Sequence, residues 1–126
     1  MIVINLAGER FELYDSMLGF QPKHAPAMHQ VLRKWLYAVA TGCYHKNDKV
    51  AATVLKWELE VPAVETYPQQ HNGYDCGMYM VKFVQQLALG RRVQDCPKWS
   101  ALDAAAMRAR MALELVDEGL HMVTGD

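Results

Sequence analysis

Residues 67–83 read YPQQHNGYDCGMYMVKF, and this stretch changes from a loop pattern to a helix pattern part-way along. Pro68 restricts the preceding Tyr67 to an extended conformation. The pair Asn72-Gly73 is a turn signal. Asp75 is suited to the N-cap position, and no glycine follows Gly77 until position 90. The stretch therefore predicts a loop followed by a helix over residues 76–89.

Cys76 lies in the first turn of this predicted helix, where free N–H groups and the helix dipole stabilise a thiolate, the nucleophilic form of cysteine. The Gln70 amide, folded back over the sulfur, and the Cys76 backbone N–H are candidates to bind the oxyanion of a tetrahedral intermediate. Gly77 leaves room for a substrate backbone. Asp75 opposes this chemistry because a carboxylate disfavours a neighbouring thiolate, so we expect it to act as a helix cap. The alternative is that Cys76 is a buried structural thiol.

The neighbours of Cys76 match a known pattern. Gln70, Asn72, Gly73, Asp75, Cys76 and Gly77 form the ungapped sequence Q-x-N-x-x-D-C-G, which resembles the signature of the SUMO-specific (ubiquitin-like-protein-specific) cysteine proteases. The resemblance implies an α+β, papain-like cysteine peptidase fold. It also implies that Cys76 attacks the carbonyl after the C-terminal glycine of a ubiquitin-like protein while Gln70 holds the oxyanion.

The first fifteen residues predict a strand hairpin. Residues 2–6 and 10–14 alternate as strands do, and residues 7–9 form a short connection. The Asp15-Ser16 pair that follows again resembles the protease family, in which this aspartate orients the catalytic histidine. The resemblance thus assigns Asp15 that role. The alternative is an aspartate that caps a strand or turn.

The middle of the chain predicts one helix and two strands. Residues 26–41 have the 3.6-residue period of a helix, with Pro26 in its first turn. Residues 53–61 alternate apolar and charged side chains, which indicates a half-exposed strand that ends at Pro62. Residues 64–67 are interpreted as a further short strand. His24, His29 and His45 lie around the helix without metal-ligand spacing, so we expect surface histidines.

A last helix is expected over residues 101–118. Ser100 and Asp103 have the spacing of a capping box, and Gly119 is the expected stop. We expect this helix to pack on its own domain. The charged residues away from its apolar face are interpreted as a solvated surface; they are Asp103, Arg110, Glu114 and Asp117.

Each predicted helix has an apolar face that we expect to be buried. The members are Met28, Val31, Leu32, Trp35, Leu36 and Val39 in the first helix, Cys76, Met80, Phe83, Val84 and Leu87 in the second, and Leu102, Ala106, Ala109, Leu113, Val116 and Leu120 in the last.

Composition sets further bounds. The 126 residues are 52% apolar, which predicts a single domain over 1–126 with a real core. A net charge of −1 gives no argument for nucleic acid or an anionic membrane, and no run has membrane-spanning length. Cys43, Cys76 and Cys96 are odd in number and lack a C-x-x-C pair, which argues against a disulfide framework and a zinc site. We expect no metal or cofactor, and an intracellular reducing compartment, nucleus or cytoplasm.

A cysteine hydrolase also needs a general base. The resembled family carries it as a histidine followed by tryptophan on the strand before the aspartate that Asp15 matches. Counting back along that spacing passes Met1, so we expect the base ahead of residue 1. The residues given are then the C-terminal part of the catalytic domain, truncated at the N-terminus. His71 and His24 are the substitutes that the sequence offers.

The resemblance thus implies a cysteine-type peptidase that removes or processes a ubiquitin-like modifier, with SUMO or its conjugates as partner, and that is catalytically incomplete as given. The alternatives are an inactive module that binds a ubiquitin-like protein, or a gene remnant. The tail that begins at Arg108 also resembles the plant, transposon-associated branch of the family.

Overall fold

The computed structural model describes residues 1–17, 23–42 and 47–124. The chain forms two compact units. The first holds Met1–Asp15 and Gly19–Ala63, and the second holds Ser16–Leu18 and Val64–Asp126. The expected single domain over 1–126 stays a prediction. The mixture of helices and a small sheet agrees with the α+β class.

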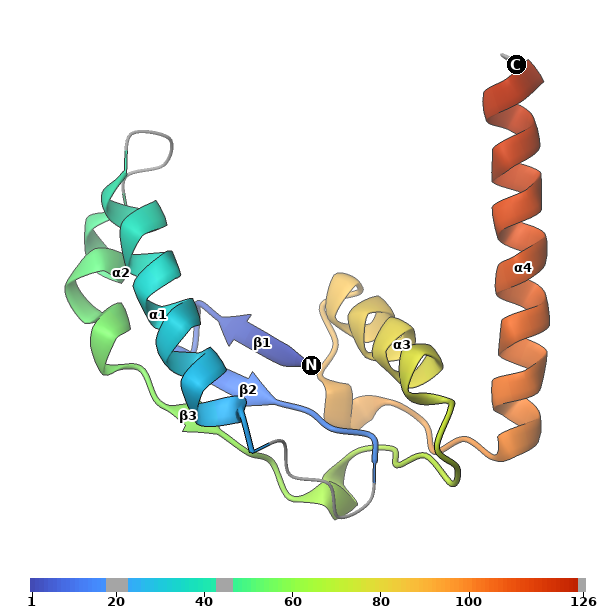
Figure 1. Ribbon diagram of the computed structural model, residues 1–126, viewed down its shortest axis with the longest axis horizontal. Coiled ribbons are helices and arrows are strands. Elements are labelled where there is room, and N and C mark those ends of the chain that lie inside the picture. The colour runs from blue at the N-terminus through green and yellow to red at the C-terminus, as the bar shows by residue number, and fades with distance from the viewer. Residues whose placement is uncertain (18–22, 43–46, 125–126) are drawn as a thin grey trace. The chain divides into compact units, whose positions relative to one another are not determined.

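The sheet of the first unit has the order β1-β2-β3 (Figure 1). β1 (Ile2–Asn5) pairs antiparallel with β2 (Arg10–Leu13), with Ile2 opposite Leu13. The predicted hairpin is therefore confirmed. Its turn is fixed by the Asn5 Oδ1 atom, which accepts a hydrogen bond from the Gly8 N–H at 2.8 Å. The positive φ of 51° falls on Glu9.

Two helices pack with the sheet around one apolar cluster. α1 (Ala25–Thr41) confirms the predicted helix, and α2 (Asp48–Thr53) continues into a 3₁₀ turn at Val54–Lys56. The buried members of the cluster are Phe11, Ala40, Val50, Val54 and Trp57. These residues come from the sheet, both helices and the 3₁₀ turn, so one core holds the elements of this unit together.

The strand predicted over residues 53–61 is wrong except near its C-terminal end. Only the short β3 (Leu59–Glu60) is a strand, and it pairs parallel with β2. The preceding residues are helical because Asn47 caps α2, its side chain accepting a hydrogen bond from the Val50 N–H at 3.1 Å. The Trp57 indole then donates to the Thr53 hydroxyl at 3.0 Å. The alternation of apolar residues was therefore not a strand signal.

The buried face of α1 is rotated from the predicted one. Met28, Val31, Trp35 and Val39 are exposed, while Leu32 and Leu36 pack against the core as predicted. The other buried positions of the helix are Ala25, His29 and Ala40.

His29 was expected on the surface, and that prediction is wrong. Its ring lies edge-on to Phe11, with centroids 4.9 Å apart, and its Nε2 is 3.1 Å from the Trp57 carbonyl oxygen. This hydrogen bond lets the imidazole replace an apolar residue in the core. Burial, with the nearby Arg33 charge, lowers the pKa of His29 despite that bond. A buried, neutral ring is the result.

The second unit is built around α3 (Cys76–Ala88), which confirms the predicted helix. The segment before it contains a 3₁₀ turn at Val64–Thr66 in place of the predicted short strand. α3 ends in a Schellman arrangement at Gly90, whose φ is +70°. There the Arg91 N–H donates to the Gln86 carbonyl at 2.9 Å.

The core of this unit is aromatic. Tyr79 and Phe83 of α3 are buried, and their rings meet Trp99 and Tyr67 respectively at centroid distances of 5.2 and 6.0 Å. Phe83 was predicted correctly as a core residue. Cys76, Met80 and Val84 were also predicted to be buried, but they are exposed. The reason is that the aromatic side chains bury the neighbouring face of the helix.

α4 (Ala101–Thr124) begins as predicted but continues past Gly119. Ser100 and Asp103 form the capping box, in which the Asp103 carboxylate accepts from the Ser100 N–H at 2.7 Å. A glycine inside a helix is tolerated at a cost of about 1 kcal/mol, so it does not enforce a stop. The predicted apolar face is exposed at each described position, with Leu102 82% exposed. The prediction that this face is buried is therefore wrong.

Candidate active site

Cys76 is the first residue of α3, and its side chain is an exposed free thiol. The first helical hydrogen bonds run from the Met78 and Tyr79 N–H groups to the Asp75 carbonyl, at 2.9 and 3.1 Å. The N–H groups of Cys76 and Gly77 precede them and point out of the helix end. A Cβ placed on Gly77 would meet no atom within 4 Å. The sulfur and these donors therefore face open space within their unit.

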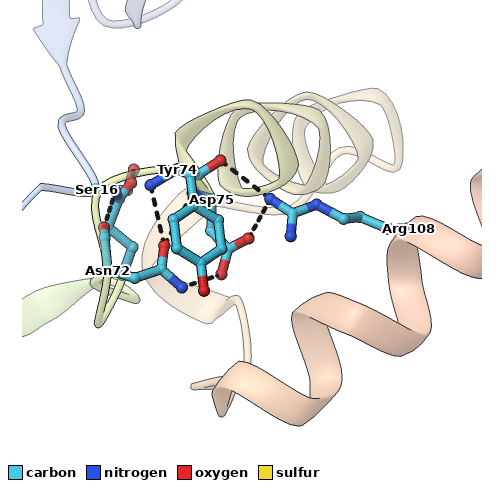
Figure 2. Close-up of polar contacts among 6 residues, drawn as sticks. Ser16, Asn72, Tyr74, Asp75 and Arg108 are labelled. Carbon is cyan, nitrogen blue, oxygen red and sulfur yellow. Dashed lines mark hydrogen bonds and ion pairs between the residues drawn. The ribbon is translucent and has the colours of Figure 1, made fainter.

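The loop before Cys76 is fixed by the side chain of Asn72. Its Oδ1 accepts hydrogen bonds from the N–H groups of Tyr74 and Asp75 at 3.1 and 3.0 Å, and its Nδ2 donates to the Asp75 carboxylate at 2.6 Å (Figure 2). An asparagine that binds the backbone two residues on forms an Asx-turn. The turn predicted at Asn72-Gly73 is therefore stabilised by the hydrogen bonds of the Asn72 side chain.

Asp75 occupies the N-cap position but makes no capping hydrogen bond, so the expected role is wrong. Its carboxylate is directed instead to Asn72 and to Arg108 of α4, with which it forms an ion pair (Figure 2). The Asp75 side chain is only 4% exposed. Sequence reasoning missed Arg108. The sequence offered one indication, namely that Arg108 does not belong to the predicted apolar face of the last helix.

Gln70 is buried and held at both ends of its side chain. The amide oxygen accepts from the Ser16 hydroxyl at 2.7 Å, and the amide nitrogen donates to the Asn72 carbonyl. The backbone N–H of Gln70 also binds the Ser16 carbonyl at 2.7 Å. Because an amide NH₂ carries two donors, one N–H of Gln70 is left for another acceptor. Ser16 is the second contributor that sequence reasoning missed, although it adjoins Asp15.

Asp15 follows β2 and is partly exposed. It belongs to the first unit, whereas Gln70 and Cys76 belong to the second. The convergence of Asp15 with the other two stays a prediction.

These features coincide with those of a known family. The model of the "Ulp1 protease family, C-terminal catalytic domain" matches residues 1–121. The chain belongs to the Ulp1 protease family. Two relatives from Arabidopsis thaliana illustrate the membership. Ubiquitin-like-specific protease ESD4 is 50% identical over 90 residues, and ubiquitin-like-specific protease 1A is 32% identical over 90 residues.

In both alignments the Ulp1-family chain is covered over 71% of its length, while it spans 16% of the length of each relative. No solved structure matches the chain. The papain-like architecture of this Ulp1-family member is therefore a proposal.

The histidines of this Ulp1-family chain fall in both units. His71 belongs to the second unit with Cys76, whereas His24 and His29 belong to the first. His71 and His24 are exposed, as expected for loop residues, and His29 is in the core of its unit. His45 and Cys43 lie outside the described residues. The roles of His71 and His24 as substitute bases stay predictions.

Within residues 1–17, 23–42 and 47–124, no group of three histidine, cysteine, aspartate or glutamate side chains is arranged to hold a metal ion. No helix there combines the length and apolar character needed to cross a membrane.

Proposed function

We propose that this Ulp1-family chain supplies the nucleophile of a papain-like cysteine peptidase that cleaves after the C-terminal glycine of a ubiquitin-like protein. SUMO or a SUMO conjugate is the proposed partner. The observation that carries the proposal is an exposed thiol at the first position of α3, preceded by a loop that holds a buried glutamine amide. The names of the relatives, ubiquitin-like-specific proteases, support the substrate class.

The proposed reaction is acyl transfer through a thioester. The general base takes the proton of the Cys76 thiol, and the sulfur attacks the carbonyl carbon of the terminal glycine to give a tetrahedral oxyanion. That oxyanion is bound by the Cys76 N–H and by the remaining N–H of Gln70. The C–N bond then breaks, and the leaving amine takes a proton from the protonated base. Water hydrolyses the thioester and releases the free carboxylate.

The proposed base is a histidine that Asp15 orients by accepting its ring N–H. Support comes from the covalent link between Asp15 and Ser16, since Ser16 binds Gln70 through both its hydroxyl and its carbonyl. The residue next to Asp15 is thereby tied to the oxyanion-binding residue. A nuclear or cytoplasmic location stays a prediction.

A covalent trap tests the function without requiring turnover. SUMO that ends in a C-terminal propargylamide is incubated with the 126-residue chain, and the thioether adduct is followed by mass spectrometry. We expect an adduct on Cys76 that is absent in Cys76→Ala and retained in Cys96→Ala. Ubiquitin with the same electrophile tests the choice of modifier.

The two neighbouring glutamines provide a matched pair for this assay. Gln70→Ala should slow adduct formation by about tenfold. Attack on the alkyne develops negative charge on carbon, which the Gln70 N–H donor faces, so the effect should be smaller than the roughly 10²–10³ of a donor to a true oxyanion. Gln69→Ala removes an amide of the same size one position away and should change the rate less than twofold, a small effect on this scale. Absence of a Cys76 adduct at any pH from 6 to 9, with the chain folded, would refute the proposal.

A further inference from the structure

Arg108 fixes the two residues that immediately precede Cys76. Its Nη2 donates to the Tyr74 carbonyl oxygen at 3.0 Å and forms an ion pair with the Asp75 carboxylate. The guanidinium carbon also lies 5.3 Å from the centroid of the Tyr74 ring. Figure 2 shows the arginine side chain reaching from α4 to both residues. A guanidinium that binds two acceptors and stacks on a ring is held in one orientation.

The same contact balances a buried charge. The Asp75 side chain is 4% exposed, and its other described partner is the neutral amide of Asn72. A carboxylate one residue from the sulfur opposes the thiolate. Breaking such an ion pair leaves an uncompensated buried charge. Arg108 therefore removes an obstacle that the Asp-Cys sequence itself creates.

The contacts also connect to the oxyanion-binding residue. Asn72 binds the Asp75 carboxylate with its side chain, and its own carbonyl accepts from the Gln70 amide. Arg108, Asp75, Asn72 and Gln70 thus form one continuous series of polar contacts.

We infer that Arg108 is a positioning residue for the Cys76 site, which keeps the Asn72–Asp75 loop in place and neutralises Asp75 beside the nucleophile. The inference rests on the proposed role of Cys76 as nucleophile. It adds a residue of α4 to that site, and Arg108 itself touches neither sulfur nor substrate.

Three charged groups lie near the first turns of α3. The loop contributes Asp75, and α4 contributes Arg108 and Asp103. Tyr79 lies one turn into α3, and burial, followed by the Asp75 and Asp103 charges, raises its pKa. Asp75 is covalently adjacent to Cys76, and Arg108 is its cationic partner. A change at Arg108 is therefore expected to alter the charge felt by the sulfur through Asp75.

Alkylation of Cys76 by iodoacetamide tests the inference, because this reaction follows the thiolate and needs no base, acid or peptidase activity. It is measured from pH 5 to 9 on the 126-residue chain with Cys43 replaced by serine. Cys96 does not interfere, since burial raises its pKa to about 11. Arg108→Gln should slow alkylation at pH 7 by about 3- to 10-fold and move its pH midpoint upward.

Arg110→Gln is the matched control, because it makes the same change of charge on the same helix; its rate should stay within about twofold. Arg108→Lys keeps the positive charge and should keep the pH midpoint. In an Asp75→Asn background, Arg108→Gln should no longer slow the reaction, because no carboxylate is left to balance.

Three outcomes overturn the inference. They are an unchanged midpoint in a folded Arg108→Gln chain, a slowing that persists in the Asp75→Asn background, and an upward shift in Arg108→Lys. If circular dichroism shows that Arg108→Gln does not fold, Arg108→Lys and the double variant with Asp75→Asn still test the inference. Failure of the SUMO trap with normal alkylation would instead count against the proposed function.

Discussion

At the scale of single residues, Glu12 is a buried carboxylate that stays charged. Asn5 and Arg10 donate to its Oε1 at 2.9 and 2.7 Å, and the Tyr14 hydroxyl donates to its Oε2 at 2.8 Å. Burial alone raises the pKa of Glu12, but these hydrogen bonds and the Arg10 charge outweigh it, so the pKa is lowered overall. The first unit therefore depends on an ionised Glu12.

A carboxyl whose folded pKa is depressed stabilises the protein above its unfolded pKa, about 4.3, and loses that contribution as the pH falls through the folded value. We expect the free energy of unfolding of the chain to decline on acidification below about pH 5. Glu12→Gln should lower the free energy of unfolding by about 1–3 kcal/mol at pH 7. In this variant the free energy of unfolding should also fall less steeply between about pH 5 and pH 3. Urea unfolding at pH 3 to 7 measures the stability at pH 7 and its dependence on pH. The same dependence on pH in the two proteins would contradict the stabilising role of ionised Glu12.

Residues of the site show how far the sequence alone could reach. The place of Cys76 at a helix start could be predicted because loop, cap position and helix are adjacent in the chain. Its exposure could not, because the helix buries a face other than the predicted one. The orientation of Asp75 could not, because its partner Arg108 comes from α4 and no local pattern links the two. Ser16 was missed for the same reason, since its contact with Gln70 depends on tertiary structure.

At the scale of elements, α2 depends on one capping side chain. The Asn47 Oδ1 accepts from the Val50 N–H at 3.1 Å, and Val50 is part of the core. Asn47→Ala should reduce the free energy of unfolding by about 0.5–2 kcal/mol, because an N-cap is lost. Asn47→Asp keeps the acceptor and should cost little. Thermal unfolding followed by circular dichroism compares them, and equal loss in both variants would rule out a capping effect.

The element errors share a physical cause. Periodicity located α1, α3 and α4 within a few residues, but it did not select the face that each buries. In α3 the large rings of Tyr79 and Phe83 outweigh the smaller Met80 and Val84 in the core. Near β3 the cap at Asn47 overrode an alternating pattern. Local signals fixed where helices lie, whereas packing decided which side chains they bury.

At the scale of the whole molecule, we expect the 126-residue chain by itself to turn over slowly. It should release a fluorogenic amine from the C-terminus of SUMO at least about 10²-fold more slowly than a Ulp1-family protease that contains its catalytic histidine, since general acid–base catalysis contributes roughly 10²–10⁴. The reason is that a cysteine hydrolase needs a general base, and we expect this histidine ahead of residue 1.

Robust release that Cys76→Ala abolishes would contradict this prediction. His71→Ala and His24→Ala would then identify the substitute base. No release combined with measurable SUMO binding would favour the inactive binding module.

The three tryptophans of the chain occupy unlike surroundings, so their intrinsic fluorescence can report on the unfolding of each unit. Trp35 on α1 is 55% exposed, Trp57 in the core of the same unit is 3% exposed, and Trp99 of the second unit lies against Tyr79. Acrylamide therefore reaches Trp35 readily and Trp57 hardly at all. With Trp35 replaced by phenylalanine, the remaining emission comes from one tryptophan in each unit. Trp57→Phe or Trp99→Phe in that background leaves an intensity that reports on a single unit as the chain is denatured.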